Sequence, residues 1–203
     1  MYAFLKRALD VALSLMALLA FAAPLLALAL WVKLDSPGPA LFRQRRVGRG
    51  KRLFTLYKFR TMRLDAPGEI PTHLLADPMR HITRVGTLLR RTSLDELPQL
   101  YNILRGDMSL VGPRPALWNQ DDLVRERDRY GANDLPPGLT GWAQVNGRDE
   151  LPIPVKARYD GEYAARRSLA FDARIVWMTA RQAFGGRGVR EGASPASPPM
   201  AGP

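Results

Sequence analysis

The chain has 203 residues and no cysteine, and its 30 Lys and Arg residues outnumber 19 Asp and Glu residues, giving a formal net charge of +11. The absence of cysteine excludes disulfides and thiolate metal sites. Because the chain has only two histidines, carboxylates must supply any acid, base or nucleophile. The positive charge predicts an anionic partner, which is nucleic acid, anionic lipid or a phosphorylated substrate. The length suits one domain with room for a membrane element.

An uncharged apolar segment extends from residue 11 to residue 32. A straight helix of this length would be roughly 33 Å long, enough to cross a hydrocarbon core of about 30 Å. Pro24 lies near the middle of the segment, and a proline inside a helix removes a backbone hydrogen bond and bends the chain. The segment is therefore either a kinked span or a re-entrant hairpin of two short helices.

Basic residues flank the apolar segment on both sides, with Lys6 and Arg7 before it and the basic stretch 43–52 after it. Because positive flanks stay on the cytoplasmic side, we expect a re-entrant hairpin over residues 1–34, broken at Pro24. A cleaved signal peptide is the main alternative. The apolar run exceeds the roughly 7–15 residues of a signal peptide, and the basic region that follows opposes export.

A short β-hairpin is predicted beyond the turn cluster that ends the apolar segment. Its strands are residues 40–42 and 53–60, and the basic stretch 43–52 separates them. We expect most of that basic stretch to attract anionic lipid headgroups, worth about 1 kcal/mol per charge. Lys58 and Arg60 alternate with apolar side chains, which predicts that both point toward one phosphate-bearing site.

Two adjacent carboxylates, Asp95 and Glu96, stand at the start of a predicted helix. Ser93 and Glu96 have the spacing of a capping box, and apolar residues then recur at helical spacing as far as Arg105. The positive end of a helix favours ionised carboxylates. Because neighbouring helical residues diverge by about 100°, one carboxylate is suited to attack and the other to hold a metal. Ordinary helix capping is the alternative.

Basic side chains are expected on both sides of this carboxylate pair. An apolar helical stripe at residues 82–89 predicts a preceding helix that delivers Arg90 beside the pair. Downstream, Gly112–Pro115 presents Arg114 between two prolines of fixed φ. Residues 137–148 mix glycines with polar side chains, which is typical either of a backbone that approaches a ligand or of a structural turn.

The remaining stretches have less specific patterns. Residues 65–78 form a predicted loop. Aromatic residues alternate with arginines between residues 158 and 184, which predicts amphipathic helices lying on a membrane surface or, alternatively, packing onto the core. From residue 185 onward Gly, Pro, Ser and Ala dominate, so we expect a disordered tail over 185–203. The predicted fold is α+β and mostly helical, with a catalytic domain over 35–184.

Taken together, several motifs resemble the bacterial sugar transferase family, the monotopic polyprenyl-phosphate phosphoglycosyl transferases. The chain looks like the minimal catalytic unit, without the extra N-terminal membrane helices of larger members. One departure is Ala23-Pro24, where the family often has Ser-Pro at the membrane-helix break. The stretches that carry the resemblance are the Pro-broken apolar segment and residues 57–62, 90–100, 106–115 and 137–148.

The resemblance implies transfer of a sugar-1-phosphate from a UDP-sugar to undecaprenyl or another polyprenyl phosphate, with release of UMP. This would be the first membrane step of bacterial glycan assembly, whether of polysaccharide, O-antigen or glycoprotein, at the cytoplasmic face of the inner membrane. It makes Asp95 the nucleophile that forms a covalent phosphoglycosyl-enzyme, and Glu96 the ligand of Mg²⁺ or, alternatively, Mn²⁺. The other implied site residues are Lys58, Arg90 and Arg114 for phosphate, and Arg148, Gln144 and Asn146 for the nucleotide.

Two other functions fit parts of the sequence. A basic adaptor attached to the membrane, binding nucleic acid or anionic lipid without catalysis, explains the charge and the apolar segment. It gives no reason for two carboxylates beside the Pro-Arg-Pro loop, so nucleic acid is not an expected partner. A metal-dependent phosphohydrolase shares the site chemistry but would release phosphate without a lipid acceptor.

Overall fold

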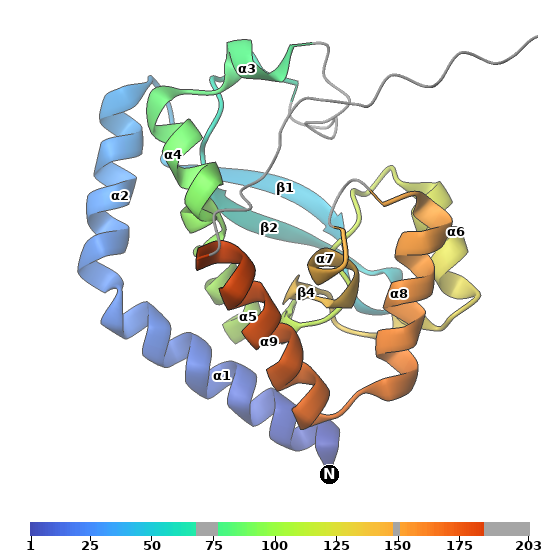
Figure 1. Ribbon diagram of the computed structural model, residues 1–203. Coiled ribbons are helices and arrows are strands. Elements are labelled where there is room, and N and C mark those ends of the chain that lie inside the picture. Colours follow the sequence, from blue (N-terminus) through green and yellow to red (C-terminus); the bar gives the residue numbers. More distant parts are fainter. Residues whose placement is uncertain (68–76, 148–150, 185–203) are drawn as a thin grey trace, which may run out of the picture.

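The fold is mostly helical with two small sheets, and the computed structural model describes residues 1–67, 77–147 and 151–184 (Figure 1). The predicted tail lies outside the described residues, as do positions 68–76 of the predicted loop. The helices are α1 Tyr2–Ala20, α2 Ala22–Asp35, α3 Pro78–His81, α4 Arg84–Thr92, α5 Gln99–Arg105, α6 Asp121–Asp128, α7 Trp142–Val145, α8 Ile153–Arg166 and α9 Leu169–Phe184. The strands are β1 Leu41–Val47, β2 Leu53–Phe59, β3 Ser109–Val111 and β4 Gly138–Thr140.

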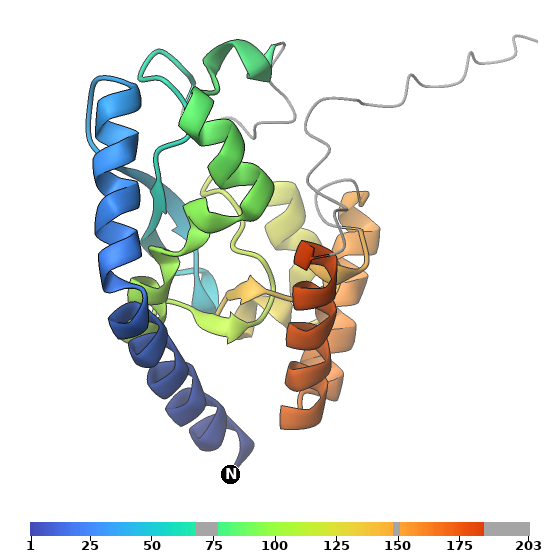
Figure 2. The same cartoon turned by 60° about the vertical axis from the view of Figure 1, so that its left-hand side comes forward.

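Helices α1 and α2 form a bent arm along the outside of the molecule (Figures 1 and 2). They meet at Phe21 with a bend of 66°. The bend lies about one turn before Pro24. Proline has no N–H to donate to the Ala20 carbonyl, and its ring crowds that carbonyl, so the helix is disrupted at that point. Among the described helices none is by itself long and apolar enough to cross a membrane, although the bent pair is by length and composition.

The arm exposes large apolar side chains along its outer face and buries two polar side chains of α1, while apolar residues of α2 such as Val32 pack inward. Phe4 and Leu26 are more than 70% exposed, whereas Asp10 and Ser14 are buried. Asp10 accepts a hydrogen bond from the Leu110 backbone N–H at 3.1 Å. This distribution is the reverse of a water-soluble helix, so the outer face of α1 and α2 is suited to contact lipid.

The predicted β-hairpin is confirmed, although β1 is longer than expected. It pairs with β2 in antiparallel register from Leu41 opposite Phe59 to Val47 opposite Leu53, so β1 includes part of the basic stretch. Leu56 of β2 packs in an apolar cluster with α5, and Phe59 packs in a second cluster with α2 and α4. Strand β2 therefore packs both against α5 and against the arm.

Helices α8 and α9 pack onto the core by one face. Tyr163, Phe171 and Ile175 are buried in a third apolar cluster with β3. The opposite side of α9 exposes Val176 and Trp177. Core packing is thus confirmed for the inner face, while contact of the outer face with a membrane surface stays a prediction.

Arg60 does not share a phosphate site with Lys58, so that prediction was wrong. Strand β2 ends at Phe59, and the Arg60 side chain, only 4% exposed, turns toward the end of α2. Its guanidinium donates to the carbonyls of Pro39, Pro37 and Ser36 at 2.7–2.8 Å. The prediction assumed that the alternation of side chains along β2 continues to Arg60, but the strand ends one residue before it.

Replacing Arg60 by Met should therefore destabilise the protein rather than act on a substrate. The substitution removes a buried guanidinium that donates several partly buried hydrogen bonds, and we expect the free energy of unfolding to fall by about 3 kcal/mol. Thermal unfolding in detergent would measure this, with Arg52→Met as the matched control because Arg52 is exposed. An Arg60→Met protein with unchanged thermal stability and lost phosphate binding would contradict this role.

Candidate active site

The two carboxylates lie in a tight turn between two helices, and the predicted capping box is wrong. Ser93 has a left-handed φ of 57° and ends α4, and its side chain makes no capping hydrogen bond. Asp95 and Glu96 belong to a single 3₁₀ turn, η3 Leu94–Glu96, and α5 begins only at Gln99. Pro98 accounts for the break, since it cannot donate an N–H to the carbonyl one helical turn before it.

Glu96 is held by two cations from different parts of the chain. Lys58 Nζ lies 2.7 Å and Arg114 Nη2 lies 2.9 Å from the same oxygen, Oε1. Burial raises the pKa of the Glu96 carboxyl, but Arg114 and Lys58 outweigh burial and hold that pKa below its usual range. Glu96 is therefore ionised at neutral pH, and its Oε2 lies outside both ion pairs.

Asp95 has a different environment from its neighbour. It is 8% exposed, and burial raises the pKa of its carboxyl. Lys58 lowers that pKa, Glu96 raises it, and Arg90 and Arg114 lower it further. Two adjacent carboxylates thus have opposite pKa shifts, which is typical of sites where such groups have separate chemical roles.

Each of the three cations is delivered by a separate element. Lys58 and Leu56 lie on the same face of β2. Leu56 packs this face against α5, and the Lys58 side chain therefore reaches Glu96. Arg90 comes from the last turn of α4, where its Nε donates to the Thr61 hydroxyl at 2.7 Å. Arg114 follows β3 in the predicted stiff loop. The structure thus brings the predicted phosphate-binding residues around one carboxylate pair.

The Arg114 loop is fixed by contacts on both of its sides. Arg46 of β1 donates from Nη1 to the Pro115 carbonyl at 2.9 Å. On the other side β4 runs parallel to β3, and a Cβ at Gly138 would lie 2.1 Å from the Gly112 backbone nitrogen. Gly138 therefore allows the two backbones to lie close together, and this contact holds the Arg114 loop in place.

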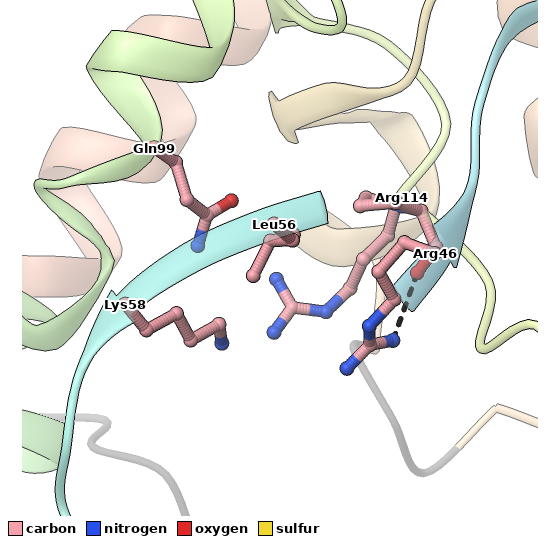
Figure 3. A pocket seen from close by; sticks show the side chains of 6 residues that line it. Arg46, Leu56, Lys58, Gln99 and Arg114 are labelled. Carbon is pink, nitrogen blue, oxygen red and sulfur yellow. Dashed lines mark hydrogen bonds between the residues drawn. The ribbon is translucent and has the colours of Figure 1, made fainter. Parts of the chain in front are cut away.

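Beside Glu96 lies a small hollow with a cationic lining (Figure 3). In Figure 3 the side chains of Lys58, Arg114 and Gln99 converge on it from three elements. Sequence reasoning did not assign Arg46 or Gln99 to the site. Gln99 stands four residues after Asp95, a helical spacing that could have indicated it, whereas nothing in the basic stretch distinguishes Arg46. The lining residues are Arg46, Leu56, Lys58, Gln99, Arg114 and Pro115.

Of the predicted nucleotide-binding residues, Gln144 and Asn146 lie in the described part of the chain, and their hydrogen bonds go to backbone carbonyls, not to the carboxylate pair. Asn146 donates from Nδ2 to the Trp142 carbonyl at 2.8 Å, at the end of α7. Gln144 has a buried Oε1 with no hydrogen-bond partner in the described part of the chain. Arg148 lies outside the described residues.

The carboxylates can be tested for a fit to a hard divalent cation. Within the described ranges no group of three or more His, Asp and Glu side chains surrounds a metal-sized space. Mg²⁺ is commonly held by one or two carboxylates together with substrate phosphates and waters, rather than by a complete protein cage. Glu96 Oε2 therefore fits Mg²⁺ only when a phosphorylated substrate supplies the other ligands.

The chain is similar to several named bacterial proteins over most of its length. A protein of Aeromonas hydrophila, named UDP-N-acetylgalactosamine-undecaprenyl-phosphate N-acetylgalactosaminephosphotransferase, is 39% identical over 197 residues, which is 93% of this chain and 46% of that protein. A UDP-glucose:undecaprenyl-phosphate glucose-1-phosphate transferase of Xanthomonas campestris pv. campestris is 44% identical over 184 residues, 87% of this chain and 38% of that protein. The chain thus spans less than half the length of these two relatives.

A third relative matches over almost its whole length. The exopolysaccharide production protein PSS of Rhizobium leguminosarum bv. phaseoli is 43% identical over 189 residues, which is 86% of this chain and 92% of that protein. The sequence profile described as bacterial sugar transferase matches residues 1–186, which include the arm, the carboxylate turn and the Arg114 loop. The chain therefore belongs to the bacterial sugar transferase family.

Proposed function

We propose that the protein transfers a sugar-1-phosphate from a UDP-sugar to undecaprenyl phosphate or another polyprenyl phosphate. The observation that carries the proposal is the pair of carboxylates with opposite pKa shifts, surrounded by Lys58, Arg90 and Arg114. A basic adaptor would need the cations but not a buried and a partly buried carboxylate among them. The printed names of the relatives, which include both a UDP-sugar and undecaprenyl phosphate, support the same reaction class.

In the first step, a carboxylate oxygen of Asp95 attacks the phosphorus that bears the sugar. The bond from that phosphorus to the bridging oxygen breaks, and UMP leaves with the bridging oxygen. An oxygen of the polyprenyl phosphate then attacks the same phosphorus, which frees Asp95 and yields the polyprenyl diphosphate sugar. A carboxylate is a weak nucleophile toward an anionic diphosphate, so nearby cations must neutralise charge, and Lys58, Arg90 and Arg114 have the positions to do this.

Glu96 is the proposed Mg²⁺ ligand, through the oxygen outside its two ion pairs. When bound, the metal would neutralise charge on the diphosphate and on the leaving UMP. Arg148, Gln144 and Asn146 are the proposed contacts on the nucleotide side. For Gln144, the buried Oε1 is an acceptor that a uracil N–H or a ribose hydroxyl would satisfy.

The arm supports a placement in the cytoplasmic membrane as a re-entrant element. Its bend of 66° turns the two helices away from one straight span, and its outer face is apolar. Arg7 of α1 donates to the carbonyls of Ile103 and Leu104 at the end of α5, which ties the arm to the helix that follows the carboxylate turn. Insertion of the arm would therefore place the site at headgroup level on the cytoplasmic face.

A panel of UDP-sugars tests the proposed function most broadly. Purified protein is incubated with Mg²⁺, undecaprenyl phosphate and one UDP-sugar at a time, and UMP is measured together with the lipid product. We expect one or a few sugars to give equal amounts of UMP and polyprenyl diphosphate sugar. Release of inorganic phosphate without a lipid product would favour a phosphohydrolase. Salt-sensitive binding of polyanions, with no turnover and no effect of Mg²⁺, would favour the adaptor.

The pH dependence of UMP release should report the ionisation of Asp95. Burial raises its pKa, so the carboxylate is lost as the pH falls through a value above the 3.8 of an ordinary aspartate. We expect kcat/KM for the UDP-sugar to have an acidic limb above that value. Single-turnover UMP release across a pH series would measure it, and an acidic limb at or below 3.8 would contradict the environment assigned to Asp95.

A further inference from the structure

Gln99 has an unusual position for an amide. It is 1% exposed, and its Nε2 has no hydrogen-bond partner in the described part of the chain. A buried donor without a partner is costly and rare in native proteins, so it calls for an explanation such as an absent ligand. Gln99 also lines the cationic hollow, and in Figure 3 its nitrogen lies on the side of Lys58.

The ligand that would satisfy this amide must accept hydrogen bonds and carry negative charge. Around the hollow, Lys58 and Arg114 present donors and Arg46 adds positive charge, and the ion pairs of Lys58 and Arg114 share the single carboxylate of Glu96. A donor or a cation would meet repulsion there, whereas phosphoryl oxygens are pure acceptors and anionic. The chemistry of the lining therefore selects a phosphoryl group.

The position along the chain indicates which phosphoryl group this is. Gln99 follows Asp95 by four residues, through the 3₁₀ turn and two residues of right-handed helical backbone, Leu97 and Pro98. Residues with this spacing lie on neighbouring sides of a helical turn. Lys58 lines the hollow with Gln99 and is also the cation with the largest effect on the Asp95 pKa. Lys58 therefore connects the hollow that Gln99 lines to the carboxylate of Asp95, which is not itself one of the lining residues.

We infer that the Gln99 amide is a catalytic hydrogen-bond donor to the sugar-bearing phosphoryl group of the nucleotide-sugar donor. The inference rests on the proposed function for the identity of the nucleotide sugar. The binding of a diphosphate beside Gln99 does not depend on the proposed function. Arg46 acts differently, because its guanidinium is bonded to Gln44 Oε1 and to the Pro115 carbonyl and so positions the Arg114 loop.

Gln99→Met tests the inference because it keeps the size of the side chain and removes only the amide. The full chain in detergent is titrated with inorganic pyrophosphate in the presence of Mg²⁺. We expect the dissociation constant to rise roughly 10- to 100-fold, the value of one hydrogen bond to a charged group. Thermal stability should stay the same or rise, since the variant no longer buries an unpaired donor.

Asn133→Leu is the matched control. Asn133 is also a buried amide, but its Nδ2 donates to the Val124 carbonyl and to Asp128, both at 2.7 Å. This variant should lose thermal stability and bind pyrophosphate as the wild type does. Gln99→Met with wild-type pyrophosphate affinity would overturn the inference, and so would Gln99→Met that loses stability as Asn133→Leu does.

Steady-state kinetics distinguish the phosphoryl group of the UDP-sugar from the phosphate of the polyprenyl acceptor. Because both steps occur at the sugar-bearing phosphorus, kcat/KM should fall in Gln99→Met for the UDP-sugar and for polyprenyl phosphate alike, each by about the same 10- to 100-fold. A loss confined to the polyprenyl phosphate would overturn the assignment to the donor. If the wild type releases UMP from no UDP-sugar, the proposed function fails, and the pyrophosphate titration still decides whether Gln99 binds a phosphoryl group. Gln99→Glu, which places a carboxylate against the phosphoryl oxygens, should weaken pyrophosphate binding more than Gln99→Met does.

Discussion

Asp95→Asn is expected to abolish UMP release, by at least about 10,000-fold, while making the protein more stable at neutral pH. The amide keeps the shape of the side chain but cannot attack phosphorus. The gain in stability follows from burial, which raises the pKa of the Asp95 carboxyl. Ionised Asp95 therefore costs folding free energy above the ordinary pKa of 3.8, and that cost is absent below it.

Two measurements check this pair of effects. UMP release is assayed in a single turnover, and thermal unfolding in detergent is followed from neutral to acidic pH. We expect the stabilisation of Asp95→Asn over the wild type to shrink as the pH falls toward 3.8. Residual turnover near the wild-type rate would remove Asp95 as the nucleophile. A less stable Asp95→Asn protein at neutral pH would contradict the environment assigned to this carboxylate.

Glu96→Gln should have the opposite effect on stability and also reduce activity. Lys58 and Arg114 both bind Glu96 Oε1, and a neutral amide at this position removes the negative charge that both cations contact. We expect the free energy of unfolding to fall by about 1–3 kcal/mol at neutral pH. Because the Glu96 pKa is lowered on folding, this contribution is present above the ordinary value of 4.5 and disappears as the pH falls through the folded pKa.

The activity of Glu96→Gln should fall about 100- to 1,000-fold, together with a weaker dependence on Mg²⁺. A Mg²⁺ titration of UMP release measures this, and Glu126→Gln is the matched control because Glu126 pairs with the exposed Arg129, away from the carboxylate turn. An unchanged Mg²⁺ titration in Glu96→Gln would count against the ligand role and would leave it as an electrostatic anchor for Lys58 and Arg114.

The sequence predicted those parts of the molecule that depend on local pattern. The break in the apolar segment follows from one proline, and the hairpin follows from strand propensity and a basic turn. The stiff loop of Gly112–Pro115 was predicted from two prolines, and the structure brings its arginine to Glu96.

The errors have long-range causes. Ser93 and Glu96 have capping-box spacing, but Ser93 adopts a left-handed conformation because α4 ends there against β2 and α2. Arg60 lies in phase with Lys58, but the end of β2 and the carbonyls after α2 redirect it. Gln99 and Arg46 join the site only through tertiary packing, which single-sequence periodicity does not report.

Direct detection of the covalent intermediate tests the central claim, that Asp95 is the nucleophile. The wild type is mixed with Mg²⁺ and the UDP-sugar that supports turnover, without polyprenyl phosphate, then quenched and examined by intact-mass and peptide-mapping mass spectrometry. We expect one equivalent of UMP, one sugar-phosphate adduct on the peptide that contains Asp95, and no adduct in Asp95→Asn. UMP release that requires the polyprenyl phosphate, or an adduct on another residue, would contradict the account.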